Sequence, residues 1–406
     1  MLKRKGIYLT ENQRLHWLQL IRSENVGAVT FMSLIQQFKT AEKALLALPE
    51  LSARGGANKS IRIASKQDAE QEMELAAKMG VKFVCVGEPD YPPYLRTTDN
   101  PPPVIAVKGN LDIFQRPSVG IVGSRNASAS GKKITTLFAN QLGEMGFAIV
   151  SGLARGIDST AHQASLKTGT IAVLAGGIDC IYPPENTSLY NNILDNGGAI
   201  ISEMPLGWQP RAVDFPRRNR IIAGLSLGLL VAEAASRSGS LITARLAADI
   251  GRIVFAIPGS PLDPRATGPN NLIKDGALLV THPNDIAETL TPLTPENPNK
   301  QLYLFEQVDD NIFPDKPPDK PEIPLITENI EGNNSSHTDD TDDNDRKAVL
   351  AALSTTPIDI ETLCFHSGVP IDKIYLLLVE LDLAGKLIRH AGGAVSLAID
   401  DFPSWN

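Results

Sequence analysis

Short apolar runs alternate with longer mixed segments through the middle of this 406-residue chain. Six runs lie between about Ser118 and Gly259, and most are separated by a segment with helical spacing of its apolar residues. They read "SVGIVG", "FAIVSG", "TIAVLAGG", "AIISE", "LGLLVAEA" and "RIVFAIPG". Buried strands of a parallel sheet have this pattern, and helical connections between them favour a doubly wound α/β fold.

The two ends of the chain follow a helical period instead. Within residues 11–48, Leu15, Leu18 and Ile21 recur at helical spacing, and similar stretches follow, so short amphipathic helices are predicted there. The proline-rich stretch "GEPDYPPYLRTTDNPPPVIAVKG" predicts a connector with short extended pieces. From Arg346 onward, three helical stretches and two short strands around a glycine turn are typical of a winged helix-turn-helix.

A change of composition marks the boundary between these regions. After about Thr291 the chain becomes rich in Pro, Asn, Asp and Glu, which predicts a disordered acidic tether. We therefore expect four parts. They are a small N-terminal helical domain at 1–85, an extended Rossmann-like domain at 86–290, a disordered acidic linker at 291–345 and a winged-helix domain at 346–400.

Charge and cysteine content narrow the function classes. The net charge is −8, but residues 291–406 alone carry 8 Lys and Arg against 21 Asp and Glu, so the middle of the chain remains open to a polyanion partner. No apolar run reaches the roughly 18 residues that span a bilayer, and no apolar signal core follows the basic start. Three separated cysteines form no CxxC pair. We expect a cytoplasmic protein with no membrane partner and no metal site.

Three loops at the expected carboxyl ends of strands carry candidate chemistry. They read "GSRNASASG", "SGLARGIDSTAH" and "EAASRSGSLITA"; each is rich in small residues, contains an arginine and leads into a helix. Backbone N–H groups at such helix starts bind anions, and Ser128, Asp158 and Ser240 are the predicted N-caps. One loop alone would be an ordinary tight turn, but three with arginines favour phosphate. The absence of GxGxxG and GxxxxGK[ST] spacing argues against dinucleotide and ATP binding.

The stretch "DFPRRNRIIAGLS" places three arginines directly before an apolar run. One interpretation is that these arginines form ion pairs with carboxylates, for which Glu203, Asp214 and Glu233 are the candidates. The other is that they line a groove with Arg125 and Arg155, in which Phe215 offers a ring face to an unpaired base. The sequence leaves both open.

Catalytic candidates are few. His162 follows Asp158 by four residues and is either an oriented base or, more commonly for such a pair, a helix-surface or capping contact. Asp179 and Glu185 flank "CIYPP" without an activated nucleophile. The three tryptophans are interpreted as packing or terminal residues. We therefore expect no enzyme activity and no catalytic residue.

The chain resembles the DNA-processing protein A family (DprA, also called Smf). The stretches that carry the resemblance run in family order from about Tyr91 to Ala277. They include "YPPYLR", "GIVGSR", "SGLARGIDSTAH", "FPRRNRIIAGLS", "EAASRSGSLITARLA" and "VFAIPGSPLDPRATGPNNLIKDGA". The resemblance implies a domain that binds and protects single-stranded DNA in natural transformation, helps to load the RecA recombinase, forms a homodimer and needs no cofactor.

From the loops and the resemblance together we expect a set of strand-binding residues. The set is Gly123, Ser124, Arg125, Arg155, Phe215, Arg217, Arg218, Asn219, Arg220, Ser238, Gly239, Ser240 and Lys274. Some family members have a Lys where this chain has Ala212, with Arg211 beside it. The last helix before the C-terminal strands, "PIDKIYLLLVELDLAG", is apolar and acidic, which predicts a protein-contact or weak DNA module.

Two other function classes remain as alternatives. The same sheet resembles nucleotide phosphoribohydrolases, whose PGGxGTxxE motif supplies a reacting Glu. The corresponding "SRSGSLITARLA" has no acid at that place. A scaffold that contacts only protein would not need arginines at three strand ends.

Overall fold

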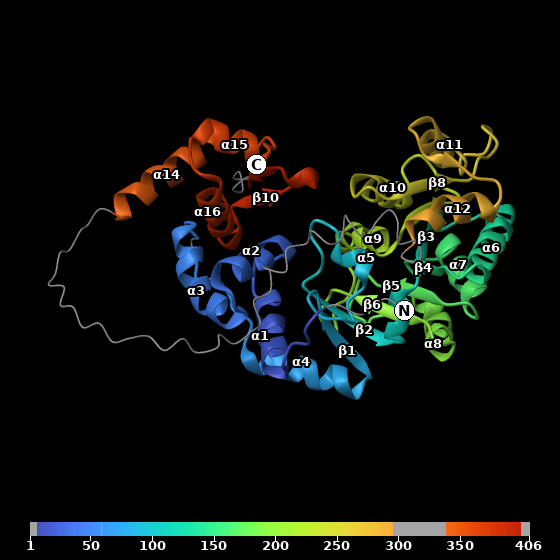
Figure 1. Cartoon of the computed structure of the whole chain (residues 1–406), viewed down its shortest axis with the longest axis horizontal. Helices are drawn as coiled ribbons and strands as arrows, with labels where there is room; N and C mark the ends of the chain where they lie inside the picture. Colours follow the sequence, from blue (N-terminus) through green and yellow to red (C-terminus); the bar gives the residue numbers. More distant parts are fainter. Residues whose placement is uncertain (1–5, 58, 295–337, 399–406) are drawn as a thin grey trace, which may run out of the picture. The chain divides into compact units, whose positions relative to one another are not determined.

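The computed structural model describes residues 6–57, 59–294 and 338–398. The chain divides into two compact units, which Figure 1 shows coloured along the sequence. The first unit holds the described residues up to Leu15 and those from Lys66 to 294, and the second holds His16–Ser65 together with 338–398.

A nine-stranded sheet forms the centre of the first unit, in the order β1-β2-β6-β5-β4-β3-β7-β8-β9. Its six parallel strands from β3 to β8 coincide with the six apolar runs, which confirms the predicted α/β class. They are β3 (Ser118–Val122), β4 (Ala148–Ser151), β5 (Thr170–Val173), β6 (Ala199–Ser202), β7 (Gly228–Val231) and β8 (Ile253–Ala256). All residues of β3 to β7 are buried, which explains why these strands read as continuous apolar runs.

Three further strands of the sheet were not predicted, although the stretch that holds one of them, β2, was expected to contain short extended pieces. β1 (Val81–Cys85) pairs antiparallel with β2 (Val104–Gly109), which pairs antiparallel with β6. β9 (Leu278–Leu279) pairs parallel with β8 at the other edge. The proline-rich stretch interpreted as a connector thus contributes β2 to the sheet, and the sheet begins at Val81, ahead of the expected boundary at 85/86.

Two helical layers cover the parallel strands. α6 (Ala129–Glu144), α7 (Ile157–Ser165) and α8 (Thr187–Asp195) follow β3, β4 and β5 and pack side by side, while α9 (Asp214–Leu225) packs on α10 (Gly239–Asp249). Right-handed crossovers place the two groups on opposite faces, because the strand order reverses at β3. The remaining helices of this unit are α4 (Lys66–Lys78), α5 (Pro93–Arg96), α11 (Thr267–Lys274) and α12 (Pro283–Leu290).

The helix starts differ in part from the predicted caps. Ser128 caps α6, since its Oγ accepts a hydrogen bond from the Gly131 N–H at 2.8 Å. The predictions for Asp158 and Ser240 were wrong, because α7 and α10 begin earlier than expected. Gly156 stands at the N-cap of α7, and the side chain of Ser238 caps α10 by accepting from the Ser240 N–H at 3.3 Å.

The second unit combines the N-terminal helices with the winged helix. α1 (Glu11–Ile21), which begins in the first unit, α2 (Ala28–Phe38) and α3 (Ala41–Arg54) are the predicted amphipathic helices. Trp17 is buried and packs edge-on against Phe31 at 4.9 Å between ring centroids. The winged helix consists of α14 (Thr338–Ala352), α15 (Ile360–Ser367), α16 (Ile371–Leu383), β10 (Leu387–Arg389) and β11 (Val395–Leu397).

The expected linker differs from the structure at its end. α14 begins at Thr338, so residues 338–345 are helical where a disordered linker was expected. Residues 295–337 of that linker lie outside the described residues.

α16 packs on α2 and α3 within the second unit. Asn25 Nδ2 donates to the Leu383 carbonyl at 3.1 Å, and Thr30 Oγ1 donates to Asp382 Oδ2 at 2.7 Å. A Cβ at Gly55 would lie 2.0 Å from the Glu380 carbonyl oxygen, so the two backbones touch where only glycine fits. α16 is the helix that would contact DNA in a DNA-binding winged helix. Its C-terminal half instead contacts other helices of the same chain.

No single helix in the described part of the chain has both the length and the apolar composition to cross a membrane. The pair α15 and α16 meets those criteria only when taken together, and the pair is bent by 109°. Across residues 6–57, 59–294 and 338–398, His, Cys, Asp and Glu side chains form no cluster of three or more that could hold a metal ion.

Candidate nucleic-acid interface

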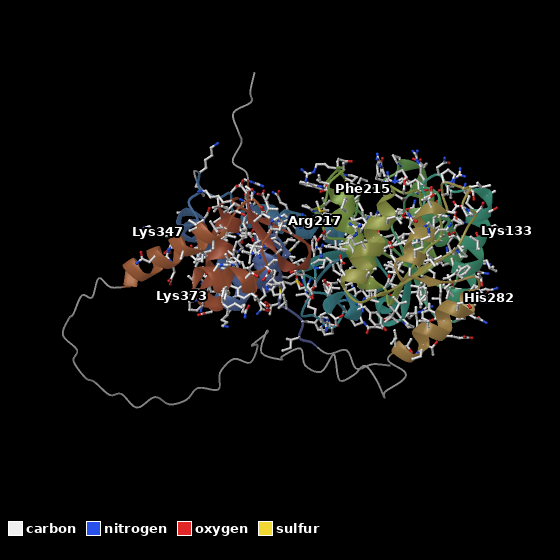
Figure 2. The ribbon with its side chains drawn as sticks, turned by 90° about the horizontal axis from the view of Figure 1, so that it is seen from above. Lys133, Phe215, Arg217, His282, Lys347 and Lys373 are labelled. Carbon is white, nitrogen blue, oxygen red and sulfur yellow. The ribbon has the colours of Figure 1, made fainter. Side chains whose placement is uncertain are left out.

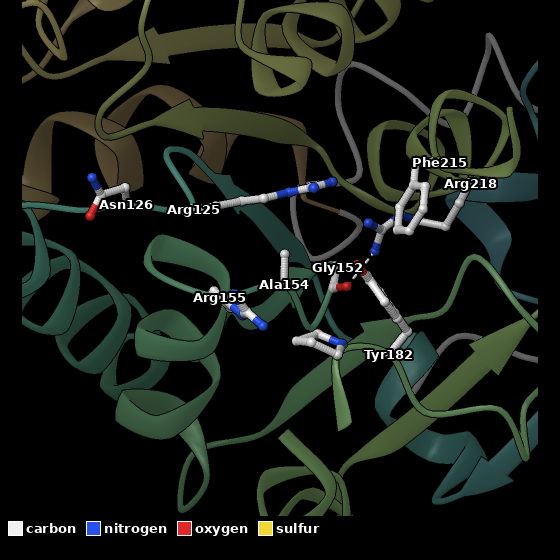
Figure 3. A pocket seen from close by; sticks show the side chains of 9 residues that line it. Arg125, Asn126, Gly152, Ala154, Arg155, Tyr182, Phe215 and Arg218 are labelled. Carbon is white, nitrogen blue, oxygen red and sulfur yellow. Dashed lines mark hydrogen bonds between the residues drawn. The ribbon is translucent and has the colours of Figure 1, made fainter. Parts of the chain in front are cut away.

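A pocket of about 390 Å³ opens at the carboxyl ends of β3, β4 and β5, against the start of α9 (Figure 3). It adjoins β3, where the strand order reverses and where open α/β sheets bind their ligands. Its lining residues are Arg125, Asn126, Gly152, Ala154, Arg155, Tyr182, Pro183, Phe215 and Arg218. Four of them, Arg125, Arg155, Phe215 and Arg218, belong to the set expected from the sequence.

Two glycines let the loops after β3 and β4 meet backbone to backbone. Gly156 has φ +75°, and a Cβ there would lie 2.3 Å from the Ser124 carbonyl oxygen. The same carbonyl accepts from the Ile157 N–H at 3.2 Å, and the Ser124 N–H donates to the Glu233 carbonyl at 2.7 Å. At Gly123 a Cβ would meet Ile157 at 2.6 Å. The glycines of these loops thus fix the pocket floor by close packing.

Glu233 occupies the start of α6. Its carboxylate accepts from the Ser128 N–H at 2.9 Å and from the Ser128 hydroxyl at 2.5 Å. A carboxylate at this position stabilises the helix through its dipole. Glu233 therefore serves this helix start, and the ion pair proposed between it and an arginine was wrong. The anion site expected at this helix start is filled by the chain's own carboxylate.

An aromatic pair with a cation beside it forms one wall of the pocket. The Tyr182 and Phe215 rings lie 5.6 Å apart, edge to face, and the Arg125 guanidinium carbon lies 5.3 Å from the Phe215 centroid. Figure 3 shows Arg125 stretching across the pocket toward Phe215. Phe215 is half-buried and Tyr182 is 48% exposed, so both rings present surface to the pocket. Sequence reasoning missed Tyr182, although its place in the loop after β5 was a usable signal.

Three of the expected arginines are paired with carboxylates. Arg217 Nε lies 3.1 Å from Glu203 Oε1, and Arg220 Nη2 pairs with Oε2 of the same residue. Arg155 pairs with Glu185. The ion-pair interpretation is therefore correct for Arg217 and Arg220, with Glu203 as the shared acid, whereas the pair of Arg155 with Glu185 was not among the expected ones. Arg217 and Arg155 keep 47% and 64% of their side chains exposed, so they can also reach a phosphate.

Arg218 differs from its neighbours because it is buried. Its Nη1 donates to the Gly152 carbonyl at 2.5 Å and to the Val173 carbonyl at 2.6 Å, at the ends of β4 and β5. Burial lowers the pKa of Arg218 to about 10, and the nearby Asp158 carboxylate opposes this shift. Arg218 thus lines the pocket with a buried guanidinium and joins the start of α9 to the ends of β4 and β5 by hydrogen bonds. The signal was present in the sequence, because Arg218 lies four residues after Asp214 and shares its buried helix face with Ile222.

Asp158 and His162 are buried beside this arginine. Asp158 Oδ2 accepts from the Gly152 N–H at 3.2 Å; burial raises the pKa of Asp158, while Arg218 and the backbone hydrogen bonds oppose the shift. His162 Nδ1 lies 2.7 Å from Thr170 Oγ1, and burial lowers the pKa of His162 to about 3. The helix-surface interpretation of His162 was wrong, because this imidazole is fully buried.

The other expected strand-binding residues lie outside the pocket lining. Asn219 Nδ2 donates to the Gly239 carbonyl at 3.4 Å, which connects α9 to the start of α10. The Ser238 and Ser240 hydroxyls lie 2.6 Å apart at that start. Lys274 is exposed at the end of α11. Of the residues that line the pocket, none is a carboxylate or a histidine; the lining combines arginines with two aromatic rings.

Comparison with known proteins gives consistent matches over most of the chain. A family described as DNA recombination-mediator protein A matches residues 82–291, a DprA-like N-terminal HHH domain matches 11–75, and a DprA winged helix domain matches 334–393. Protein Smf of Escherichia coli is 39% identical over 309 residues, which cover 76% of this chain and 75% of that protein. Protein Smf of Synechocystis is 33% identical over 399 residues, which cover 95% and 98%.

Solved structures match as well. The X-ray structure of DNA processing protein A from Streptococcus pneumoniae is 35% identical, has a TM-score of 0.57, and covers 70% of this chain and 98% of its own. That of DNA processing protein A from Helicobacter pylori, described for its single-stranded DNA binding mode, is 28% identical with a TM-score of 0.48 and covers 53% and 97%.

Proposed function

The chain belongs to the DNA recombination-mediator protein A (DprA/Smf) family, and we propose that it binds single-stranded DNA in the pocket at the carboxyl ends of β3 to β5. The observation that carries the proposal is the Arg125, Phe215 and Tyr182 arrangement. Bases of a single strand stack on aromatic rings, while a cation beside the ring holds the backbone. A pocket of about 390 Å³ is near the small end of ligand sites. It therefore accommodates a single nucleotide unit and excludes a duplex, whose base faces are hidden.

Membership of the family also supports a finer role. We propose that the chain protects single strands in the cytoplasm, acts as a homodimer without a cofactor and delivers the strands to the RecA recombinase. Addition of the chain should shorten the lag before RecA hydrolyses ATP on strands coated with single-strand binding protein. An unchanged lag would leave strand binding in place and remove the mediator role.

Arg125→Ala should weaken binding to single strands of every sequence, because its guanidinium lies beside the Phe215 ring and lines the pocket. Loss of one phosphate contact should flatten the plot of log K against log salt by about 0.7. The measurement is fluorescence anisotropy with labelled single strands, duplex and RNA of equal length over a range of salt concentrations. Lys133→Ala is a matched control, since Lys133 is an exposed cation of α6 on the other side of this unit from Phe215 and Arg217 (Figure 2).

Glu203→Gln extends the same test. Glu203 holds both Arg217 and Arg220, so its removal should free two cations and strengthen single-strand binding. Unchanged affinity and salt dependence in Arg125→Ala, or weaker binding in a folded Glu203→Gln protein, would contradict strand binding at this pocket.

Phe215→Ala should lower single-strand affinity by roughly 1–3 kcal/mol with little change in the salt dependence, because stacking releases no counterions. The half-buried ring makes a small change in stability the expected result, against the roughly 3–5 kcal/mol that loss of a core Phe would cost. Phe215→Tyr should keep most of the affinity, since the ring face remains. Thermal melting beside binding measures both effects. A loss of stability large enough to explain the weaker binding, or an equal loss with duplex, would return Phe215 to a packing role.

A further inference from the structure

A second aromatic and cation pair lies on the loop that precedes α9. Trp208 is partly exposed, and the guanidinium carbon of Arg211 lies 4.5 Å from its ring centroid. The indole Nε1 donates to Asp214 Oδ2 at 3.0 Å, and the Arg211 N–H donates to the same oxygen at 2.8 Å. Asp214 is buried, with 3% of its side chain exposed. A buried carboxylate therefore fixes both members of a pair that itself faces outward.

This loop is fixed to the residues that lead into the pocket wall. The Asp179 carboxylate accepts from the Gly207 N–H at 2.9 Å and 3.0 Å, and the Gly177 N–H donates to the Trp208 carbonyl at 2.9 Å. Gln209 Nε2 lies 3.3 Å from Cys180 Sγ, two residues before Tyr182. At its other end the loop runs into Asp214, the neighbour of Phe215. Trp208 is thus joined on both sides to segments that carry the Tyr182 and Phe215 rings.

The Trp208 and Arg211 pair differs from a packing contact because it is exposed. Trp17, which does pack, is 6% exposed and contacts another aromatic ring. Trp208 instead contacts Arg211, whose side chain is 61% exposed. The packing interpretation of Trp208 drawn from the sequence does not describe this arrangement. An indole that is held by its N–H and flanked by an exposed guanidinium has the components of a base-stacking position.

We propose that Trp208 and Arg211 form a second nucleotide position next to the pocket. A base stacks on the indole, and Arg211 contacts the adjoining phosphate. This inference rests on the proposed single-strand binding. It adds the path of the DNA strand, which passes from the Tyr182 and Phe215 rings to the loop before α9. We expect this position to accept any base, because every base has a π-face and the proposed contacts are stacking on the ring and a bond to phosphate.

The test compares Trp208→Ala with Trp208→Phe in the full chain, using labelled oligothymidylate. The alanine variant should bind on the order of ten-fold more weakly, and the phenylalanine variant should keep most of the affinity, because it keeps a ring face. If the indole serves only to hold Asp214 through its N–H, both variants will lose affinity alike, and that result would overturn the second position.

Tryptophan fluorescence gives a second, independent measurement. Oligothymidylate should quench the emission of the wild-type chain, and most of this quenching should be absent in Trp208→Phe but present in Phe215→Ala at saturating strand. Quenching that is identical in wild type and Trp208→Phe would contradict stacking at this residue. If the wild-type chain binds no single strand at all, the proposed function itself fails, and that outcome is distinct from binding that ignores Trp208.

Discussion

Arg218→Met is expected to lower the free energy of unfolding of the sheet-containing unit by about 3–5 kcal/mol. The substitution removes a buried positive charge and leaves the buried Asp158 carboxylate nearby without it. The guanidinium faces the buried Asp158 and donates to the carbonyls that end β4 and β5. Methionine fills similar space but leaves the Asp158 carboxylate without a counter-charge. It also leaves the Gly152 and Val173 carbonyls without these donors, and each unsatisfied buried group adds to the loss.

Neighbouring positions on α9 supply the controls. Arg217→Met removes an arginine that is 47% exposed, and its partner Glu203, which is 7% exposed, keeps its pair with Arg220, so the expected loss of stability is smaller than that of Arg218→Met. Arg218→Met combined with Asp158→Asn should recover part of the lost stability, because the buried charge is then gone as well. Denaturant unfolding followed by circular dichroism measures all three variants. Native stability in Arg218→Met with lost strand binding would instead make Arg218 a direct ligand contact.

The parallel core of the fold was predictable because its strands are buried on both faces. Such strands carry runs of mostly apolar residues, so β3 to β7 were visible from the pattern along the chain, and β8 was visible in the same way although its first two residues are only half-buried. The outer strands were not assigned to the sheet. β2, which lies between β1 and β6, directly follows a run of prolines, and both residues of β9, at the edge of the sheet, are exposed. Their place in the sheet depends on pairing with distant residues, which a local pattern does not contain.

The location of the candidate site was more predictable from the sequence than the roles of its individual residues. Glycine-rich loops at strand ends and the Phe215 segment were visible, because backbone approach and strand ends impose local composition. Glu203 was among the candidate partners of the arginines, but the sequence could not select it over Asp214 and Glu233, and it gave no sign that Glu185, from the loop after β5, pairs with Arg155. Arg218 shows the limit of reading "PRRNR" as one charged run, because consecutive residues of a helix point in different directions. One of these arginines supports the pocket while its neighbours face solvent or Glu203.

Stability should fall as the pH drops from 6.5 toward 3, and His162 should account for much of the loss. Burial holds the pKa of His162 at about 3 in the folded chain, below the ordinary value of 6.5. The Thr170 hydroxyl donates to the Ile149 carbonyl at 2.8 Å, so His162 Nδ1 is the donor to Thr170, and the ring is neutral. Between these two pKa values, His162 binds a proton in the unfolded chain but not in the folded chain. The contribution of His162 is therefore complete above pH 6.5 and declines by roughly 1.4 kcal/mol for each pH unit below it.

Asp158 acts in the opposite sense, because its pKa is raised in the folded chain. At pH values above the ordinary pKa of an aspartate, its protonation in the folded chain therefore offsets part of the stability that His162 loses. Arg218, the other charged group facing the imidazole, stays protonated throughout this range and adds only to the repulsion. His162→Asn keeps a donor for Thr170 but cannot take up the proton. Its stability should be lower at pH 7 because the smaller side chain leaves space, yet it should change less between pH 6.5 and pH 4.5 than that of the wild type. The two stability profiles, measured by denaturant unfolding at each pH, should therefore converge on acidification. Parallel profiles would mean that the folded chain protonates His162 as readily as the unfolded chain does, and that the interior around Arg218 and Asp158 admits a second positive charge.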